Sequence, residues 1–504
     1  MNKIGFVGTD ARTLMAALVV EMTTSETCRD KFHGIVFRGM PAMPPFAKIM
    51  GWTVEFIPTD DNSPRAYAKA IIEALREGKL DCVMIMPEDL LYQGVVDEIV
   101  EAGFGDCVIG LTSAGSFIEG DKAEAKKFFR QAGVPVADEW TVADARNYKS
   151  VLSTCLKYIG KYGGAVLKYP YSAGGKGARV ILDTWQIRSV YNGLMKDYKK
   201  DYRGICGKGE WPLLIESRMS GVEISFTALV DKNGNFQILP TAMDYSERFP
   251  GPAGPNNPIT GGMGSISPHP AETPRLLEMA GEKIFRPLVS AMKNKGILKP
   301  CVLYPGCFVS LDETGQPADV RVCEVNIRPG EPEFQPIVRR IRNLGALIKA
   351  MLDGNLDEVQ PEVRADQISI AVALVTGPGG PKGQKGYPWS CTKGEIVDMD
   401  IEYLRKKKIT LIPSAMTYTG HESNFLSDGS RVAFISANAT VKSGQKREEA
   451  AEALRQKLLT VFNGEKVRVV PRENKEGNRL AVRPDIGEHY KLFGDIFSHE
   501  SESG

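Results

Sequence analysis

Short apolar runs alternate with amphipathic helical repeats along the first 119 residues of the chain. Five of these runs have the length and composition of buried strands: Ile4–Val7, Gly34–Phe37, Val54–Ile57, Cys82–Met86 and Cys107–Ile109. Apolar residues recur at helical spacing in the segments Thr13–Met22, Pro64–Leu75 and Gln93–Glu101. Strands that alternate with helices are typical of a parallel, doubly wound sheet. We therefore expect residues 1–119 to form an N-terminal α/β domain.

The pattern changes after this first domain. Helical repeats at Asp121–Ala132 and Tyr148–Tyr162 precede a strand at Ala165–Tyr169, and a glycine-rich stretch, Ser172–Ala178, joins it to a second strand at Arg179–Leu182. The stretch connects two strands, and no Ser or Thr follows its lysine as one does in a Walker A loop. It is therefore either a flap whose amides and lysines close over phosphates or a plain hairpin turn.

Further strands and one long loop fill the middle of the chain. The strands are expected at Leu213–Glu216, Glu223–Val230, Phe236–Thr241, Val302–Ser310 and Val320–Ile327. Residues 251–264 are too rich in glycine and proline for a regular element, and long ordered loops are usually functional. We expect a middle domain at 120–355, with a flap subdomain at about 135–217, then a C-terminal α+β domain at 356–490 and a polar tail at 491–504.

The strand that ends near residue 327 carries its polar side chains on one face. Glu324, Asn326 and Arg328 stand at every second position, so they point to the same side of a strand. A carboxylate and an amide oxygen side by side suit Mg²⁺, which takes few protein ligands when nucleotide phosphates supply the others. An adjacent arginine suits a carboxylate or a phosphate. The alternative is an edge strand with a solvated polar face.

The loop after the first strand is a second candidate site. Gly8-Thr9-Asp10-Ala11-Arg12-Thr13 leads directly into the first predicted helix. A helix N-terminus holds anions well, and Arg12 would strengthen that binding. The loop is not a G-x-G-x-x-G, so it does not indicate a dinucleotide site. An ordinary turn between strand and helix is an equally good interpretation.

Composition narrows the class of protein. The 504 residues carry a net charge of +1, which gives no electrostatic reason for a nucleic-acid or membrane partner. The nine cysteines are scattered without a C-x-x-C, and the histidines lack zinc-ligand spacing. There is no signal-peptide pattern and no apolar run close to the roughly 20 residues of a membrane span. We expect a cytoplasmic enzyme that acts on small molecules.

Five motifs occur in an order that is similar to the ATP-grasp superfamily. They are E-G-D-K at 119–122, Lys168 with A-G-G-K-G at 173–177, G-P-N and T-G-G-M-G at 254–264, E-V-N-I-R-P-G-E-P-E-F-Q-P at 324–336, and R-P-D-I-G at 483–487. More narrowly, the chain resembles the glycinamide ribonucleotide synthetase (phosphoribosylamine–glycine ligase) family over nearly all of residues 80–490. The resemblance implies an ATP-grasp fold between the N-terminal doubly wound domain and the C-terminal α+β domain.

The resemblance also implies the reaction. A carboxylate attacks the γ-phosphate of ATP to give an acyl phosphate, and an amine then displaces the phosphate. The default substrates are 5-phosphoribosylamine and glycine. Glu324 and Asn326 would hold Mg²⁺, or Mn²⁺ in its place. The residues implied at ATP are Lys168, Gly174, Gly175, Lys176, Gly177, Glu216 and Glu223.

The remaining residues implied by the resemblance lie around the reacting groups. Arg328, Asp244 and Gly262 would be catalytic. The residues implied at the substrates are Gly8, Arg12, Pro87, Glu88, Asn256, Thr260 and Glu331. The enzyme would be a monomer or a small homo-oligomer.

The departures from the family pattern fall mostly on the substrate side. The family's G-x-G-G-R-E-H loop keeps only one glycine and one arginine, Gly8 and Arg12, and its R-F-G-D-P-E reads R-P-G-E-P-E here, with Pro329 and Glu331. Two alternatives therefore stay open beside the default reaction. One is an ATP-grasp ligase with a changed amine or acid, and the other is a non-catalytic nucleotide-binding subunit.

Overall fold

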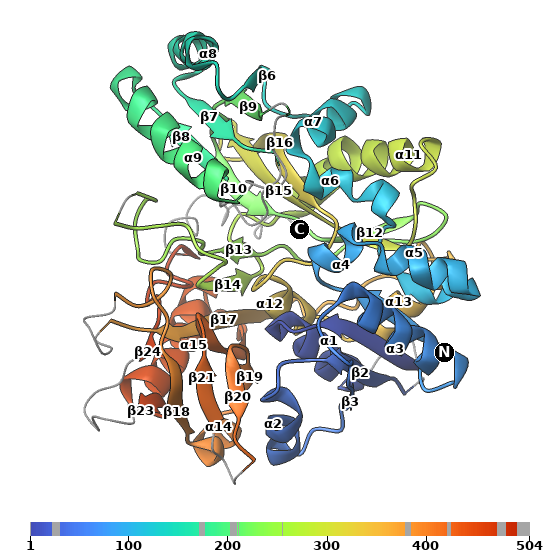
Figure 1. Ribbon diagram of the computed structural model, residues 1–504. Coiled ribbons are helices and arrows are strands. Elements are labelled where there is room, and N and C mark those ends of the chain that lie inside the picture. The colour runs from blue at the N-terminus through green and yellow to red at the C-terminus, as the bar shows by residue number, and fades with distance from the viewer. Residues whose placement is uncertain are drawn as a thin grey trace.

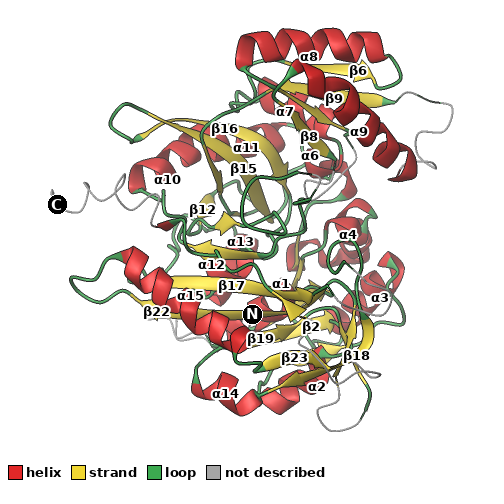
Figure 2. Ribbon diagram, turned by 90° about the vertical axis from the view of Figure 1, so that its left-hand side faces the viewer, coloured by secondary structure: helices red, strands yellow, loops and turns green. Residues whose placement is uncertain are grey.

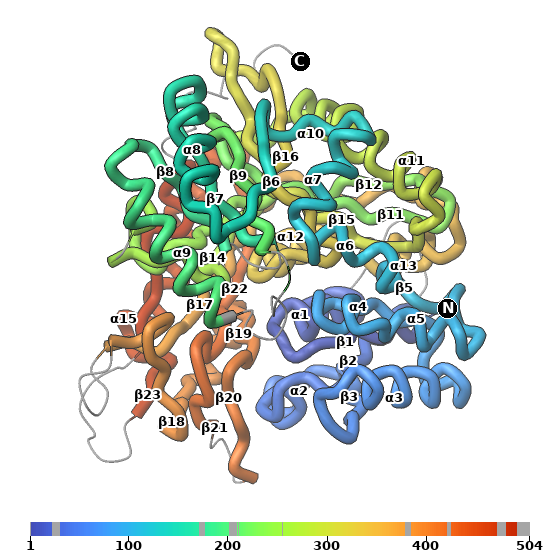
Figure 3. Tube along the Cα trace, turned by 45° about the horizontal axis from the view of Figure 1, so that its top comes forward, coloured from blue at the N-terminus to red at the C-terminus, as the bar shows by residue number. Residues whose placement is uncertain are grey.

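The computed structural model describes residues 2–22, 31–170, 177–201, 209, 211–254, 256–378, 385–420, 425–470 and 480–490. Gly174, Gly175 and Lys176 of the predicted flap loop lie outside these residues, as does the predicted tail. Figure 1 shows the flap subdomain at the top, the middle domain below it, and the N-terminal and C-terminal domains side by side at the bottom, and Figure 3 shows the same arrangement from another side. None of the helices in the described ranges is long and apolar enough to cross a membrane.

A five-stranded parallel sheet of order β3-β2-β1-β4-β5 forms the N-terminal domain, as predicted. Its strands are β1 (Lys3–Gly8), β2 (His33–Arg38), β3 (Glu55–Ile57), β4 (Cys82–Ile85) and β5 (Val108–Ile109), and its helices are α1 (Ala11–Glu21), α2 (Met43–Met50), α3 (Pro64–Arg76), α4 (Glu88–Tyr92) and α5 (Val95–Ile99). The carboxyl ends of the parallel strands meet at one edge. The loops after β1 and β4 lead into the first turns of α1 and α4, so Arg12 and Glu88 in those turns are neighbours.

Two helices of this domain differ from the prediction. Helix α2 was not expected from the pattern, yet Pro44 stands in its first turn, where proline is tolerated. The single helix expected at Gln93–Glu101 is interrupted, because Gly94 has a φ of 77° between α4 and α5. A π-helical turn at Val100–Phe104 then follows α5.

The flap subdomain is a four-stranded sheet of order β6-β9-β7-β8, covered by two helices (Figure 1). Its elements are β6 (Trp140–Asp144), α8 (Tyr148–Tyr162), β7 (Ala165–Lys168), β8 (Ala178–Ile181), α9 (Ile187–Asp201) and β9 (Pro212–Ser217). A short 3-10 turn at Thr184–Gln186 precedes α9. Its apolar core is a separate cluster, made only of residues between Ala143 and Ile215. The glycine-rich stretch joins β7 to its antiparallel neighbour β8, as expected.

The rest of the middle domain is built on the long hairpin of β15 and β16. The sheet has the order β10-β15-β11-β12, with β16 paired to β15. Its elements are α6 (Phe117–Gly120), α7 (Lys122–Gln131), β10 (Val222–Ser225), β11 (Ala228–Val230), β12 (Phe236–Ile238), α10 (Pro274–Ala280), α11 (Arg286–Asn294), β15 (Cys301–Leu311) and β16 (Pro317–Asn326). A π-helical turn, Gly281–Phe285, joins α10 to α11. Helices α6 and α7 lie near the polar end of β16.

The C-terminal domain has two sheets, of orders β13-β14-β17-β22-β19 and β20-β21-β18-β23, and α15 lies against β17 and β22 (Figure 2). The strands are β13 (Met243–Asp244), β14 (Gly264–Ser267), β17 (Gln367–Thr376), β18 (Lys393–Met399), β19 (Thr410–Pro413), β20 (Met416–Tyr418), β21 (Phe425–Asp428), β22 (Arg431–Thr440), β23 (Val467–Val470) and β24 (Leu480–Ala481). The helices are α12 (Phe334–Val338), α13 (Leu344–Asp353), α14 (Ile401–Lys406) and α15 (Arg447–Asn463). Strand β14 pairs with β17, so one sheet crosses the boundary expected at residue 355. The exact domain boundaries stay a prediction.

The N-terminal helix is buried against the segment that follows the polar strand. Leu14 of α1 shares one apolar cluster with Phe334 of α12 and Leu347 of α13, and all three are fully buried. Burial of apolar surface is the main stabilising contribution to such packing. The packing places the loop between β1 and α1 beside residues 328–336.

Candidate functional site

The polar end of β16 faces α7. An Oε atom of Glu324 lies 3.2 Å from Nζ of Lys122, and Lys122 lowers the pKa of that carboxylate. Asn326 donates from Nδ2 to the carbonyl oxygen of Tyr304 at 3.2 Å, which leaves its Oδ1 for another partner. The two oxygens expected from the alternating pattern thus lie on adjacent same-face positions of one strand.

Two lysines and a glutamate form a buried ion cluster next to this strand. Glu216 of β9 forms ion pairs with Lys126 at 2.7 Å and with Lys168 at 2.5 Å. Burial acts to raise the pKa of Glu216, but the two lysines outweigh it and lower that pKa to about 2. Lys126 also donates to the carbonyl oxygen of Cys323 at 3.2 Å, so the cluster ties the flap sheet to β16.

A small cavity lies between these groups and α7. Charged and polar residues from four elements line it: Glu119, Lys122, Lys126, Lys168, Glu324 and Asn326. Within the described ranges, no three or more His, Cys, Asp and Glu side chains come together as a metal site. A cation at Glu324 therefore has to take most of its ligands from a bound molecule, as Mg²⁺ does from nucleotide phosphates.

Arg328 joins the polar strand to the N-terminal domain. Its Nε lies 3.0 Å from Glu88, and one of its terminal nitrogens lies 3.2 Å from Glu119. The other carboxylate oxygen of Glu119 accepts from the Ile327 amide at 2.9 Å. Burial raises the pKa of Glu119, although Arg328 acts in the opposite direction. The guanidinium expected to face a substrate is thus held by two carboxylates from α6 and α4.

The loop after β1 meets the R-P-G-E segment. The Arg12 amide donates to Glu331 at 2.9 Å, and the Arg12 side chain donates to Asp10 at 2.9 Å and to the carbonyl oxygen of Pro329. Burial and Asp10 raise the pKa of Glu331 to about 7. Residues predicted as substrate contacts do come together here. Their donors are already bound to carboxylates of the chain itself, so a phosphate contact at Arg12 stays a prediction.

Gly8 and Pro87 belong to the same edge of the sheet. A Cβ placed on Gly8 would lie 3.2 Å from the Pro87 ring, so the two loops pack closely. Asn256, by contrast, is exposed on the long loop, and no contact in the described part of the chain brings it to this cluster. Gly177, at the end of the glycine-rich stretch, accepts from the Tyr169 amide at 3.2 Å.

The T-G-G-M-G loop packs against the cis Glu331–Pro332 peptide. Gly262 has a φ of 93°, and a Cβ there would lie 2.3 Å from Cδ of Pro332. Thr260 fixes the turn, because its Oγ1 donates to the Ser246 carbonyl at 2.8 Å and accepts from the Gly262 amide at 3.1 Å. The loop therefore has one conformation against the R-P-G-E segment, and only glycine fits at its centre.

Gly262→Ala should lower kcat about tenfold, because the new Cβ would push the loop away from Pro332 and misplace the reacting groups. Gly251→Ala is the matched control. Gly251 has a similar φ of 101°, but a Cβ added there would meet no atom within 4 Å, so it tests backbone strain without the close contact. Equal rates for the two variants in a phosphate-release assay would contradict this role.

A second and larger cavity, of about 280 Å³, has Asp244 in its wall. It is lined by residues of β10, the 242–251 segment and the segment after β24: Glu223, Asp244, Glu247, Arg483, Asp485 and His489. Burial, Glu333 and Glu223 raise the pKa of Asp244 well above its ordinary range. Glu223, predicted at ATP, thus lies in the wall of this second cavity and not among the residues that line the first.

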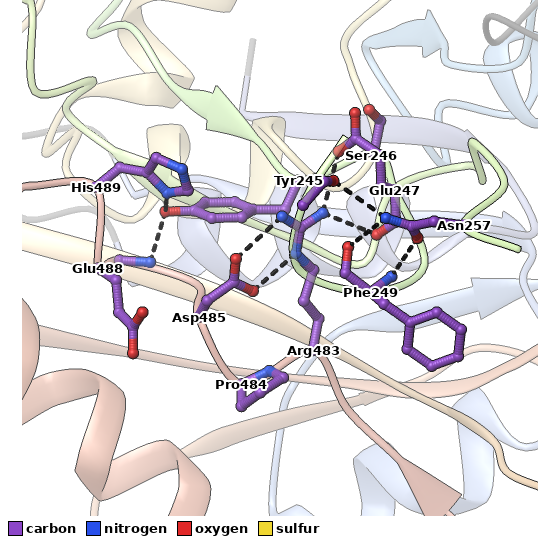
Figure 4. A network of polar contacts seen from close by, with 12 residues as sticks. Tyr245, Ser246, Glu247, Phe249, Asn257, Arg483, Pro484, Asp485, Glu488 and His489 are labelled. Carbon is purple, nitrogen blue, oxygen red and sulfur yellow. Dashed lines mark hydrogen bonds and ion pairs between the residues drawn. The ribbon is translucent and has the colours of Figure 1, made fainter. Parts of the chain in front are cut away.

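Figure 4 shows how the segment after β24 fixes the wall of the second cavity. Arg483 binds Asp485 through two hydrogen bonds of 2.7 and 3.0 Å, and donates to the backbone and side chain of Glu247 at 2.9 and 3.1 Å. Its guanidinium also lies 5.0 Å from the centre of the Tyr245 ring. The R-P-D-I-G motif therefore orients the loop next to Asp244.

Three functional candidates were not predicted from the sequence: Lys126, Glu119 and Arg431. Lys126 stands one helical turn after Lys122 on α7, a spacing that could have indicated a shared face. Glu119 opens the E-G-D-K motif and could have been weighed with it. Arg431 of β22 donates to the Gly261 carbonyl, and no local pattern could have indicated this contact between distant segments.

Comparisons with known proteins give one consistent result. A family model described as the phosphoribosylglycinamide synthetase ATP-grasp (A) domain matches residues 120–334. The chain is 30% identical over 387 residues to the phosphoribosylamine–glycine ligase of Salmonella typhimurium, covering 76% of this chain and 81% of that protein. Its fold is similar to the crystal structure of phosphoribosylamine–glycine ligase from Thermotoga maritima, with a TM-score of 0.66, 21% identity, and coverage of 96% and 100% of the two chains.

A more distant structure has a bound nucleotide. The biotin carboxylase domain of Hydrogenobacter thermophilus 2-oxoglutarate carboxylase, solved with MgADP, ADP and bicarbonate, has a TM-score of 0.59 and 16% identity to this chain. The match covers 99% of this chain and 94% of that domain. At this identity the likeness concerns the fold alone. Together with the family model, it confirms the predicted ATP-grasp fold.

Proposed function

The chain belongs to the phosphoribosylamine–glycine ligase family and is an ATP-dependent ligase. We propose which of its residues bind the nucleotide, the metal and the substrate carboxylate when it joins 5-phosphoribosylamine to glycine. One observation supports the assignment most: Glu324 and Asn326 share a cavity with Lys122, Lys126 and Lys168. Phosphates need cations on one side and a metal site on the other, and this cavity offers both. A nucleotide-binding subunit without catalysis would not need the fixed Thr260–Gly264 loop against the R-P-G-E segment.

The reaction has two steps. A glycine carboxylate oxygen attacks the γ-phosphorus of ATP, the bond to the bridging oxygen breaks, and ADP leaves with its electron pair. The amine nitrogen then attacks the carbonyl carbon of glycyl phosphate, the C–N bond forms, the C–O bond breaks with its electron pair leaving on inorganic phosphate, and the nitrogen loses a proton. Lys168 and Lys126 hold the nucleotide phosphates, and Arg328 orients the carboxylate that reacts.

The donors at β16 fit a divalent cation. Glu324 and Asn326 are the residues that would hold Mg²⁺, or Mn²⁺ in its place, because one carboxylate and the open Oδ1 of the amide are hard oxygen ligands. When bound, the ion neutralises charge on the nucleotide phosphates. A cytoplasmic location and a monomeric or small homo-oligomeric state stay predictions.

A second candidate is a ligase with the same chemistry and a changed amine. The observation that favours it is that backbone amides at the N-terminus of α1 are already bound by carboxylates of the chain. Glu331 accepts from the Arg12 amide, and Asp10 accepts from the Thr13 amide at 3.3 Å, so two donors that could bind a phosphate already have carboxylate partners. An amine without a phosphate would not need to displace them.

A substrate screen tests both candidates. Phosphate release would be followed with Mg²⁺–ATP, phosphoribosylamine generated in the assay, and glycine, with alanine and serine compared. Turnover with this amine and glycine supports the default pair. Turnover that requires a different, non-phosphorylated amine supports the second candidate. Failure to release phosphate with every amine and acid pair would contradict the ligase assignment.

A further inference from the structure

His489 lines the second cavity and contacts a buried tyrosine through one ring nitrogen. It follows β24 and lines the second cavity together with Asp244 and Glu223. Its Nδ1 lies 3.1 Å from the hydroxyl of Tyr245, and that hydroxyl accepts from the Gly487 amide at 2.7 Å. Figure 4 shows the ring edge-on to Tyr245, with its second nitrogen turned away from the tyrosine. Among the described residues, no hydrogen-bond partner contacts Nε2.

The contact with Tyr245 orients the His489 ring. The phenol oxygen accepts from the Gly487 amide and has a second lone pair that can accept Nδ1–H. In that tautomer Nε2 carries a lone pair and no proton. This arrangement, a base oriented by a third group on its other ring nitrogen, is the usual one for catalytic histidines.

Titratable groups lie near His489 on three segments. Its own segment carries Arg483, Asp485 and Glu488, the loop next to Asp244 carries Tyr245 and Glu247, and His269 follows β14. Burial lowers the pKa of His489, Arg483 acts in the same direction, and the carboxylates oppose them. The ring is therefore neutral at neutral pH and able to take a proton.

The acids of the same cavity are less suited to take that proton. Asp244 favours its protonated form, because burial and Glu333 raise its pKa well above the ordinary range. Glu247 is bound by Arg483 at 3.1 Å. A neutral imidazole has neither restriction.

We propose that His489 is the general base of the amide-forming step. As the amine nitrogen attacks the carbonyl carbon of the acyl phosphate, the C–N bond forms and the C–O bond breaks. The electron pair of that bond leaves on inorganic phosphate, and the proton lost from the nitrogen passes to Nε2 of His489. This assignment rests on the ligase function proposed above and adds to it the group that accepts the proton.

His489→Gln and His489→Ala test the proposal. Each should lower kcat for amide formation about 10²-fold, the usual contribution of a general base. Acyl-phosphate formation should continue, and exchange of ¹⁸O between the bridging and non-bridging β,γ positions of ATP, with glycine and without the amine, would measure it. His33→Gln is the matched control, because His33 is exposed on β2. Variants that keep the full rate of amide formation would overturn the proposal.

Two further measurements separate catalysis from a structural role. Added imidazole should restore the rate of His489→Ala. In the wild type, the amine-dependent rate should fall as the pH drops through the pKa of His489, below its ordinary value, and this decline should be absent in His489→Gln. A variant that loses isotope exchange and amide formation equally, without rescue by imidazole, would show a structural role and overturn the proposal. A wild type that turns over no substrate pair would instead refute the ligase function itself.

Tyr245→Phe provides a second, milder variant. It keeps the ring and removes the oxygen that fixes Nδ1, so His489 stays present but loses its orientation. We expect a loss of about tenfold in amide formation, smaller than that of His489→Ala, with isotope exchange unchanged. An unchanged rate would mean that the contact does not serve the base and would overturn the orientation argued here.

Discussion

Glu324→Ala should abolish ATP turnover, lowering kcat by about 10³-fold or more. Glu324 supplies the carboxylate of the oxygen pair on β16 that lines the lysine-rich cavity, and its loss removes one of two hard oxygens available to a divalent cation. The fold should persist, because the side chain is partly exposed and its ion pair is with Lys122. Phosphate release at saturating Mg²⁺–ATP, with thermal unfolding as a check, measures both effects.

Glu324→Gln refines this test. It keeps the shape and one oxygen ligand but removes the charge, so part of the rate should return as the Mg²⁺ concentration is raised. Glu313→Ala, at the far turn of the same hairpin, is the matched control and should leave kcat and the Mg²⁺ dependence unchanged. If Glu324→Ala keeps its rate, or if its Mg²⁺ dependence equals that of the wild type, Glu324 does not hold the metal.

The sequence predicted those parts of the site that depend on local periodicity. Alternation along β16 was enough to put Glu324 and Asn326 on one face, and the order of strands and helices was enough for the parallel sheet. In the first case the geometry of one strand determines the result, and in the second the alternation of neighbouring elements does. The family motifs added the ATP-grasp fold, which the comparisons confirm.

Contacts between distant segments could not be predicted from local patterns in the sequence. The Arg12 amide donates to Glu331, which lies 319 residues further along the chain, and this contact occupies a helix N-terminus that the local pattern suggested for a phosphate. The pairing of β14 with β17 likewise joins strands from two predicted domains. Both contacts depend on how the whole chain packs, as the burial of α1 against α12 does.

Glu216→Gln should destabilise the protein by about 3–5 kcal/mol, because it leaves two buried lysines without their carboxylate. Glu216 is 1% exposed, and Lys126 and Lys168 are almost equally buried. Glu139→Gln is the matched control. Glu139 also binds two lysines, Lys157 and Lys161, but at the surface, where water and salt screen the charges. Denaturant unfolding would compare the two, and equal losses would contradict a special role for burial.

The pH dependence gives the same cluster an independent test. The pKa of Glu216 is lowered from 4.5 to about 2 in the folded protein. A lowered pKa means that the stabilisation is fully present above the unfolded value and is lost as the pH falls through the folded value. The wild type should therefore lose about 3 kcal/mol of its free energy of unfolding between roughly pH 4.5 and pH 2 through this group, and Glu216→Gln should lack that loss.

Because buried charges are little screened, about 0.5 M salt should leave the destabilisation by Glu216→Gln in place while it removes that by Glu139→Gln. Loss of the Glu216 effect in salt would show that the ion cluster is open to solvent, and the flap sheet would then not be held to β16 by buried charge.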